Sequence, residues 1–123
     1  MLLLLLSASF PGKEELHMQI DSAKFEIIDK NGSLKIVPRS FIKAPLEKTI
    51  PVEAWANDQD GILIQVMLFA SFGFANMLEV LREDSEPVIK LPSPNDFEII
   101  VLGPDPKSFE FLRCQDVRPV KLF

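Results

Sequence analysis

The chain has 123 residues, of which 47% are hydrophobic and 25% are charged, a composition that excludes a disordered chain and predicts one globular domain. Its net charge of -5 argues against a nucleic acid partner, because affinity for a phosphate backbone depends on Lys and Arg. Cys114 is the single cysteine, which excludes an internal disulfide and is typical of a reducing compartment, so we expect a cytoplasmic protein.

The chain begins with MLLLLL, an almost purely aliphatic run that ends at Leu6. A secretory signal has a basic start and an apolar run of about 7–15 residues, and no Lys or Arg precedes these leucines. A membrane-spanning helix needs about 20 apolar residues. We therefore expect no membrane partner, a retained N-terminus, and a helix from Leu2 to Ser9 that ends before Pro11. Because this helix is apolar on all sides, we expect it to form the deepest layer, between the sheet and a second helix.

The second helix is predicted over residues 13–23. Leu16, Ile20 and Ala23 recur there at helical spacing and form one apolar stripe. His17, the single histidine, lies beside this stripe. A metal site requires further ligands at suitable spacing, so we expect His17 to be a surface residue.

From residue 24 the apolar pattern changes from helical to strand periodicity. The segment KFEIIDKNGSLKIVP contains Asn31-Gly32, the pair typical of a two-residue type I′ hairpin turn. This turn predicts that Ile27 pairs with Ile36. Residues 39–48 are predicted to form a loop.

The central segment, residues 49–84, predicts three antiparallel strands joined by five-residue loops at 57–61 and 71–75. The first loop places Val52 opposite Val66, and the second places Val66 opposite Val80. Both registers put even-numbered residues on one face, which we expect to be the core face. Its members are Ile50, Val52, Ala54, Ile62, Ile64, Val66, Leu68, Leu78 and Val80.

The other face of these strands is too apolar for bare solvent, although Glu53, Gln65 and Glu79 also lie on it. The interaction face that we predict on it consists of Trp55, Met67, Phe69, Met77 and Leu81. Either the tail through Phe109, Phe111 and Val120 or another subunit covers this face. We favour a homodimer, because a two-fold pairing is self-complementary.

The last third of the chain is rich in turns, with predicted strands at 88–91 and 97–102. We therefore expect one α+β domain over residues 1–123. It consists of a short N-terminal helix pair (1–23) packed on a predominantly antiparallel meander sheet of about five to seven strands (24–102), followed by a tail or edge strand (103–123).

Three short motifs resemble those of a family of small bacterial proteins of unknown function. They are FPGKEELHMQ near the start, the DQDG of the central hairpin, and LEVLRED after it. The resemblance covers residues 2–95. It implies a bacterial α+β domain and leaves the activity open. The first helix departs from the family pattern, because it is almost all leucine where the family has an amphipathic helix.

The segment NDQDG is similar to the start of an EF-hand calcium loop. Aligning Gly61 with the invariant glycine puts Ala56 at the first ligand position and Met67 at the twelfth, and neither can bind calcium. Asp58 and Asp60 are therefore predicted to form a turn. We expect no metal and no cofactor.

A second acidic loop contains Glu83 and Asp84. Together with Asp58 and Asp60 it could form a general acid/base site, but hydrophilic loops give little reason for the raised pKa that a general acid needs, so we expect a solvated loop.

These observations predict a non-catalytic binding or protein-interaction module, and leave enzymatic activity uncertain. The alternative is a small-ligand binder or a carboxylate-based enzyme that uses a pocket between helix and sheet. A pocket lined by buried carboxylates would favour the alternative, whereas an exposed apolar patch ringed by charge would favour the module.

The retained N-terminus has a direct test. Intact-mass measurement of the protein from its native host should find the leucine run in place, because the run lacks the features of a cleaved signal. Loss of about 8 to 25 N-terminal residues would contradict this expectation.

Overall fold

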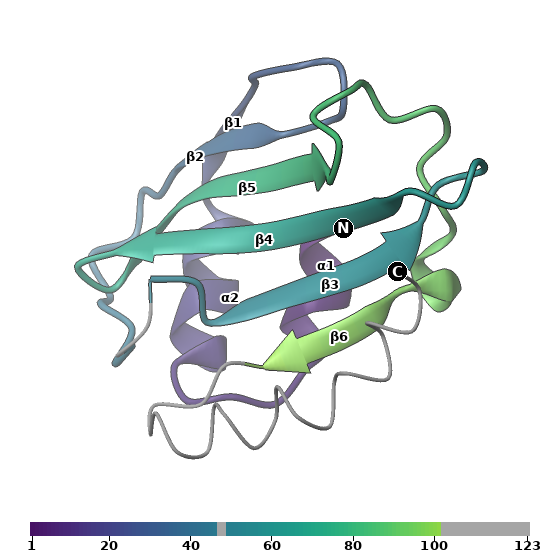
Figure 1. The fold of residues 1–123 in the computed structure, drawn as a ribbon. Coiled ribbons are helices and arrows are strands. Elements are labelled where there is room, and N and C mark those ends of the chain that lie inside the picture. Colours follow the sequence, from purple (N-terminus) through teal and green to yellow (C-terminus); the bar gives the residue numbers. More distant parts are fainter. Residues whose placement is uncertain (47–48, 102–123) are drawn as a thin grey trace.

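Two short helices lie on one face of a six-stranded antiparallel sheet in the part of the chain that the structure describes, residues 1–46 and 49–101 (Figure 1). This structure is a computed structural model. Its elements are α1 (Leu2–Leu6), α2 (Lys13–Asp21), β1 (Lys24–Ile27), β2 (Leu34–Val37), β3 (Val52–Asn57), β4 (Leu63–Ser71), β5 (Phe74–Arg82), the short 3₁₀ helix η1 (Pro94–Asp96) and β6 (Glu98–Val101). The predicted α+β class is confirmed.

The sheet has the strand order β1-β2-β5-β4-β3-β6, and every neighbouring pair is antiparallel. Strands β3, β4 and β5 form a meander in the centre. The β1–β2 hairpin joins this meander at β5, and β6 joins it at β3. In the described part of the chain, β1 therefore forms one edge of the sheet.

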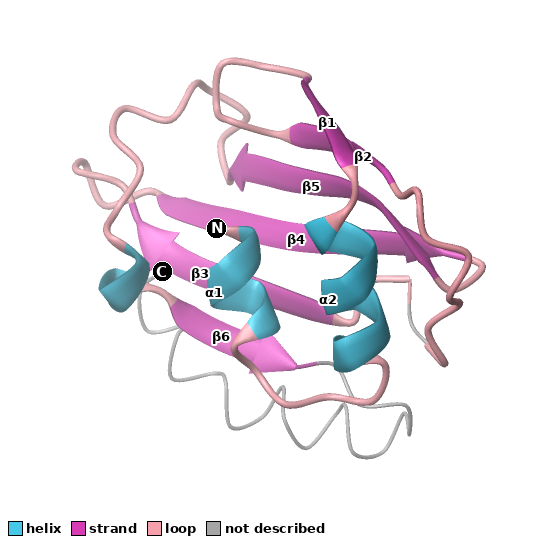
Figure 2. Ribbon diagram, turned by 180° about the vertical axis from the view of Figure 1, so that it is seen from behind, coloured by secondary structure: helices cyan, strands magenta, loops and turns pink. Residues whose placement is uncertain are grey.

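The two helices lie side by side, with α1 over β3 and α2 over β5 (Figure 2). The prediction that α1 forms a deeper layer than α2 is wrong. A helix of five residues turns little more than once, so it buries one side, through Leu5 and Leu6, and leaves Leu3 73% exposed. No helix within the described ranges has both the length and the apolar character needed to cross a membrane.

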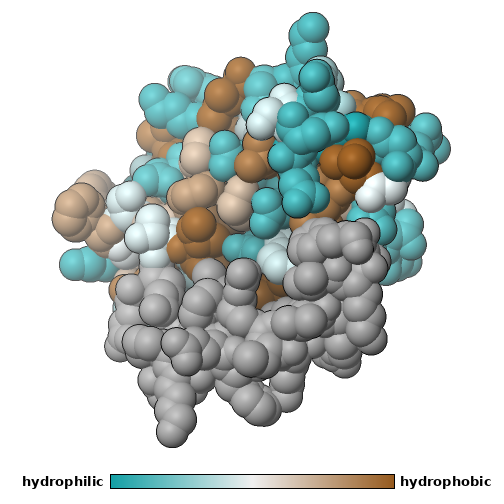
Figure 3. Space-filling model, in the orientation of Figure 1, coloured by the Kyte–Doolittle hydropathy of each residue, from teal (hydrophilic) through white to brown (hydrophobic). Residues whose placement is uncertain are grey.

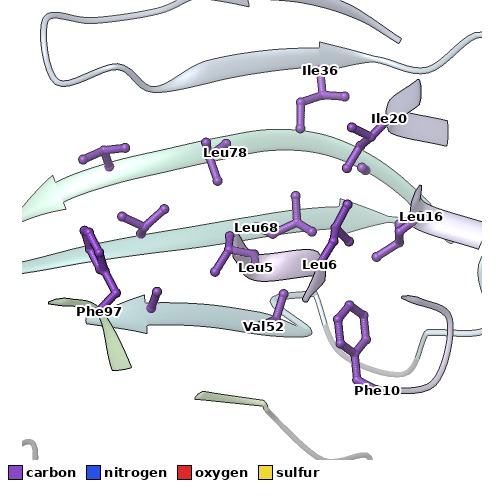
Figure 4. Close-up of a cluster of buried hydrophobic side chains, with 14 of the residues drawn as sticks. Leu5, Leu6, Phe10, Leu16, Ile20, Ile36, Val52, Leu68, Leu78 and Phe97 are labelled. Carbon is purple, nitrogen blue, oxygen red and sulfur yellow. The ribbon is translucent and has the colours of Figure 1, made fainter. Parts of the chain in front are cut away.

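The main core lies between the helices and the even-numbered face of the central strands (Figure 4). The predicted core face is confirmed for seven of its nine members, while Ile50 and Ile62 are half-buried. The buried strand residues on this face include Val52, Ala54, Ile64, Val66, Leu68, Leu78 and Val80. Leu5, Leu6, Leu16 and Ile20 cover them from the helices.

The register between β3 and β4 differs from the prediction by two residues, since Val52 lies opposite Leu68. The loop spans residues 58–62, one position later than expected. Asp58 sets it, because the Asp58 N–H donates to the Ile62 carbonyl and the Gly61 N–H donates to the Asp58 carbonyl. A shift of two residues leaves every side chain on the same face of the sheet, so the predicted core residues are still correct.

The predicted register between β4 and β5 is correct, with Leu68 opposite Leu78, but the predicted five-residue loop is wrong. The strands continue into a two-residue turn, Phe72-Gly73, in which both residues have positive φ as a type I′ turn requires. A bulge at Asn76 absorbs the difference in length.

The type I′ turn expected at Asn31-Gly32 is also wrong, and Phe25 rather than Ile27 pairs with Ile36. A longer loop joins β1 to β2. The Asn31 side chain is engaged elsewhere, since its Nδ2 donates to the Val80 carbonyl and its Oδ1 accepts from the Val88 N–H. These tertiary bonds outweigh the local turn preference of the sequence.

Gln19 of α2 is fully buried and connects three segments. Its Nε2 donates to the carbonyls of Ile42 and Gly73, each at 2.8 Å, and its Oε1 accepts from the Ala75 N–H at 2.9 Å. The side chain thus joins α2 to the β4–β5 turn and to the segment that follows β2.

Gln19→Leu should lower the free energy of unfolding by about 2 kcal/mol or more, because buried backbone groups lose their partner. Chemical denaturation measures this change. Met18→Gln, at an exposed position on the same helix, is the matched control and should change it by less than about 0.5 kcal/mol. Equal effects of the two substitutions would show that the Gln19 bonds contribute no net stability.

Candidate functional site

A buried arginine at the end of β5 forms ion pairs with three carboxylates. Arg82 is 6% exposed and lies opposite Ile64, on the core side of the sheet. Its guanidinium contacts the carboxylates of Asp58 at 3.0 Å, Asp60 at 2.6 Å and Asp84 at 2.8 Å. The two acidic loops that the sequence suggested are therefore brought together, with a cation between them.

Asp58 is the buried member of this cluster and has four donors. Besides Arg82, its carboxylate accepts hydrogen bonds from the backbone N–H groups of Gln59, Ile89 and Lys90. The strand expected at residues 88–91 is absent from the structure of this segment, because a side chain rather than a neighbouring strand satisfies its backbone donors. The turn predicted at Asp58 and Asp60 is present, although the Asp58 side chain is buried rather than solvated.

Asp58 and Asp84 keep their negative charges, and Arg82 keeps its positive charge. Burial raises the pKa of the Asp58 carboxyl, but the hydrogen bonds from Ile89, Gln59, Lys90 and Arg82 outweigh burial and lower that pKa to about 2. The hydrogen bond to Arg82 lowers the pKa of Asp84, and the carboxylates together raise the pKa of Arg82. A general acid needs a raised carboxyl pKa, so Asp58 and Asp84 lack the property that this role requires.

Within the described ranges, no three His, Cys, Asp or Glu side chains are grouped so that they could hold a metal ion. Asp58 and Asp60 bind Arg82 instead of facing an open position. His17 lies on the exposed side of α2, with its Nδ1 3.3 Å from a carboxylate oxygen of Asp21. Cys114 lies outside the described residues.

The predicted interaction face lies on the sheet face opposite the helices, and it is only partly accessible. Trp55 is 5% exposed and Met67 is 9% exposed, while Phe69, Met77 and Leu81 are half-buried. The coloured part of this face in Figure 3 is a mixture of apolar and polar side chains. The residues predicted to cover it from the tail, Phe109, Phe111 and Val120, lie outside the described residues.

Among the described residues, the most exposed aromatic side chains lie elsewhere, at the end of the sheet where β4 turns into β5. Phe72 at the tip of this turn is 89% exposed, and Phe41 is 98% exposed. Each immediately precedes a residue whose carbonyl accepts a hydrogen bond from Gln19, so their backbones lie close together. In Figure 3, apolar atoms protrude at the left, where Figure 1 draws the β4–β5 turn.

A hollow of about 330 Å³ lies between α1 and the sheet, as the alternative prediction requires. Its walls are almost entirely apolar. They include Leu2, Leu3, Leu34, Leu78, Val80 and Leu91 together with the polar Asn31. Because no carboxylate of the described residues lines this hollow, those residues do not supply the chemistry expected of a carboxylate-based site.

The acidic residues of the cluster are predicted from the sequence, whereas the role of Arg82, which binds them, is not. The signal for Arg82 was available, because Arg82 follows the predicted core residue Val80 by two positions and therefore shares its face. A buried arginine must find carboxylates. No local pattern marks Gln19, whose partners lie 23 to 56 residues away, or Phe41 and Phe72.

Comparison of the chain with family models, with curated proteins and with solved structures finds no match.

Asp58→Asn should destabilise the protein at neutral pH by about 2 to 4 kcal/mol, because it leaves a buried ion pair broken. The folded-state pKa of about 2 is below the ordinary 3.8, so the ionised carboxylate stabilises the fold. That contribution is present above about pH 4 and is lost as the pH falls toward 2. Denaturant titrations at a series of pH values should show this acid-dependent loss in the wild type and a weaker one in the variant.

The matched control is Asp60→Asn, since the Asp60 side chain is 39% exposed and binds the same arginine. It should cost less than about 1 kcal/mol. If both substitutions cost the same, the buried charge of Asp58 does not hold this end of the sheet together.

Proposed function

We propose that this chain is a non-catalytic protein-interaction module that binds its partner through the aromatic end, defined as Phe41 and Phe72 with the neighbouring Arg39 and Lys43. The observation that carries the proposal is the conformation of Phe72. This bulky residue occupies the first central position of a type I′ turn with φ of 53°, and its side chain is 89% exposed.

That conformation is unfavourable for phenylalanine. The left-handed region costs most L-residues about 1 kcal/mol, and Asn, Asp or Gly is the usual choice at this turn position. The ring also contributes little to the core, because it lies in solvent. A residue that raises the energy of the turn without adding burial is explained by a role outside the fold.

The surroundings of Phe72 support a protein partner. Phe41 is exposed beside it, and paired exposed aromatic residues are typical of interface anchors. Arg39 and Lys43 flank Phe41, and no acidic residue occurs between positions 34 and 46. We therefore propose a partner with an apolar pocket bordered by carboxylates.

The alternatives receive less support. Asp58 and Asp84 have lowered pKa values and bind Arg82, and the apolar hollow beneath α1 offers few polar groups to orient a ligand. We propose a cytoplasmic site of action on the basis of the single cysteine, and a bacterial origin on the basis of the resemblance of the FPG and LEVLRED motifs.

The test replaces both aromatic residues at once, as Phe41→Ser with Phe72→Asn. Because Asn tolerates the left-handed region, the melting temperature should stay equal or rise. The partner, isolated with the wild-type protein from its native host and then purified, should bind the variant at least 100-fold more weakly in calorimetry, as expected for two aromatic anchors.

Leu3→Ser is the matched control, since Leu3 is an exposed apolar residue on the helical side of the molecule. It should bind the partner like the wild type. Unchanged affinity of the double variant would contradict the proposal, as would a wild-type protein that binds anionic lipid vesicles through the same two residues and no protein.

A further inference from the structure

The open edge of β1 carries apolar residues that the fold leaves exposed. All four residues of β1 are exposed, among them Phe25 at 41% and Ile27 at 79%, and Ile28 just beyond the strand is 52% exposed. β1 pairs with β2 along one side, and among the described strands it has no neighbour on the other. Natural sheets usually protect such an edge with proline, a bulge or a covering segment. The sequence of β1 contains no proline.

The backbone of β1 has a defined set of free hydrogen-bonding groups. Antiparallel pairs alternate between residues that exchange backbone hydrogen bonds and residues that do not. The Ile28 N–H donates to the Ser33 carbonyl at 2.9 Å, so by alternation Lys24 and Glu26 also bond toward β2. The N–H and C=O groups of Phe25 and Ile27 therefore face the open edge.

We propose that β1 pairs with β1 of a second copy of this chain, about a two-fold axis centred on Phe25. In this register Phe25 exchanges two backbone hydrogen bonds with its own copy. Lys24 of each chain lies opposite Glu26 of the other, and Ile27 lies opposite Ala23. The two sheets become one continuous sheet, and the pairing is self-complementary as a two-fold interface requires.

Charge selects this register over its neighbours. Lys24 and Glu26 form a non-hydrogen-bonded pair across the axis, the arrangement in which opposite side chains come closest. Centring the axis on Lys24 would set Lys24 against its own copy, and centring it on Glu26 would do the same for Glu26. An axis centred on Phe25 instead forms two opposite-charge pairs. A register shifted by one residue is excluded by the backbone, because it would place N–H and C=O groups that face the open edge opposite groups that already bond to β2.

The row of charges continues into each chain. Glu26 lies opposite Lys35 of β2, so Lys35, Glu26 and the Lys24 of the second copy alternate in sign across three strands. Ion pairs and a hydrogen-bonded edge thus act together with the burial of Phe25 and Ile27. This interface does not require Trp55 or Met67, which are already buried, to contact a second subunit. A dimer through the face opposite the helices would require it.

The test uses two single substitutions that repel in their own homodimers and attract each other. Lys24→Glu gives a chain with two acidic residues at this edge, and Glu26→Lys gives a chain with two basic residues. Sedimentation velocity over about 1 to 500 µM should find the wild type dimerising. Each variant should dimerise at least tenfold more weakly.

An equimolar mixture of the two variants should recover the dimer, because every cross-strand pair in the mixed species has opposite charges. The double variant Lys24→Glu with Glu26→Lys should also recover it as a homodimer. Unchanged circular dichroism shows that the exposed substitutions leave the fold intact, so a loss of mass reports on association alone.

Residue-resolved hydrogen exchange gives an independent readout. The amides of Phe25 and Ile27 should become protected as concentration rises, whereas that of Glu26, already bonded to β2, should not change with concentration. A wild type that stays monomeric at 500 µM, a mixture that associates no better than its components, or a dimer that Met77→Glu abolishes and the charge variants leave intact would overturn the proposal.

Discussion

The guanidinium of Arg82 is buried at the end of β5. A buried charge without a partner strongly lowers the free energy of unfolding, so Arg82 requires carboxylates beside it. Asp58, Asp60 and Asp84 provide the pairing from two different loops. The same Asp58 carboxylate also binds the backbone of residues 89 and 90, so the long connection from β5 is fixed before it reaches η1 and β6. The same buried carboxylate thus holds both Arg82 and part of the connection that leads to β6.

The opposite end of the sheet is closed by a neutral group. Gln19 binds the backbone of the β4–β5 turn and of the segment after β2, and the Ala44 N–H donates to the same Gly73 carbonyl at 2.8 Å. A Cβ atom at Gly73 would lie 2.7 Å from the Ala44 carbonyl oxygen, which leaves room there for glycine alone. Both ends of the sheet are thus held by side chains that bind backbone groups of distant segments. Such bonds position loops without extending the β ladder.

The sequence predicts which residues of each central strand face the core, but it predicts the strand registers only in part. Alternating apolar residues assign faces, but a shift of two residues keeps every side chain on its face, as happened between β3 and β4. The apolar residues at 88–91 predict a strand, because the sequence pattern cannot reveal that Asp58 binds the N–H groups of residues 89 and 90. Asn31-Gly32 predicts a tight turn, because a local rule cannot anticipate the hydrogen bonds of the Asn31 side chain with Val80 and Val88.

The same reasoning explains how much of the candidate site was foreseen. Asp58, Asp60 and Asp84 were identified from their loops, since acidic residues in turns are visible in a sequence. Arg82 was not identified as their partner, although the alternation of side chains along the strand places Arg82 on the core side. Phe41 and Phe72 both fall in predicted loops, but a loop aromatic can be buried or exposed, and no local pattern decides which.

The described residues at the two ends of the sheet differ in charge. Acidic side chains gather where β3 turns into β4 and where β5 ends, with Asp60, Glu83, Asp84 and Glu86 exposed there, while Arg39 and Lys43 lie at the opposite end. In the described part of the chain, exposed acidic residues thus outnumber basic ones at one end of the sheet, and an uneven charge of this kind orients a protein in the field of an approaching charged surface. Near an acidic surface the protein would rotate until Phe72 leads, so that diffusion delivers the hairpin tip first and salt slows the encounter.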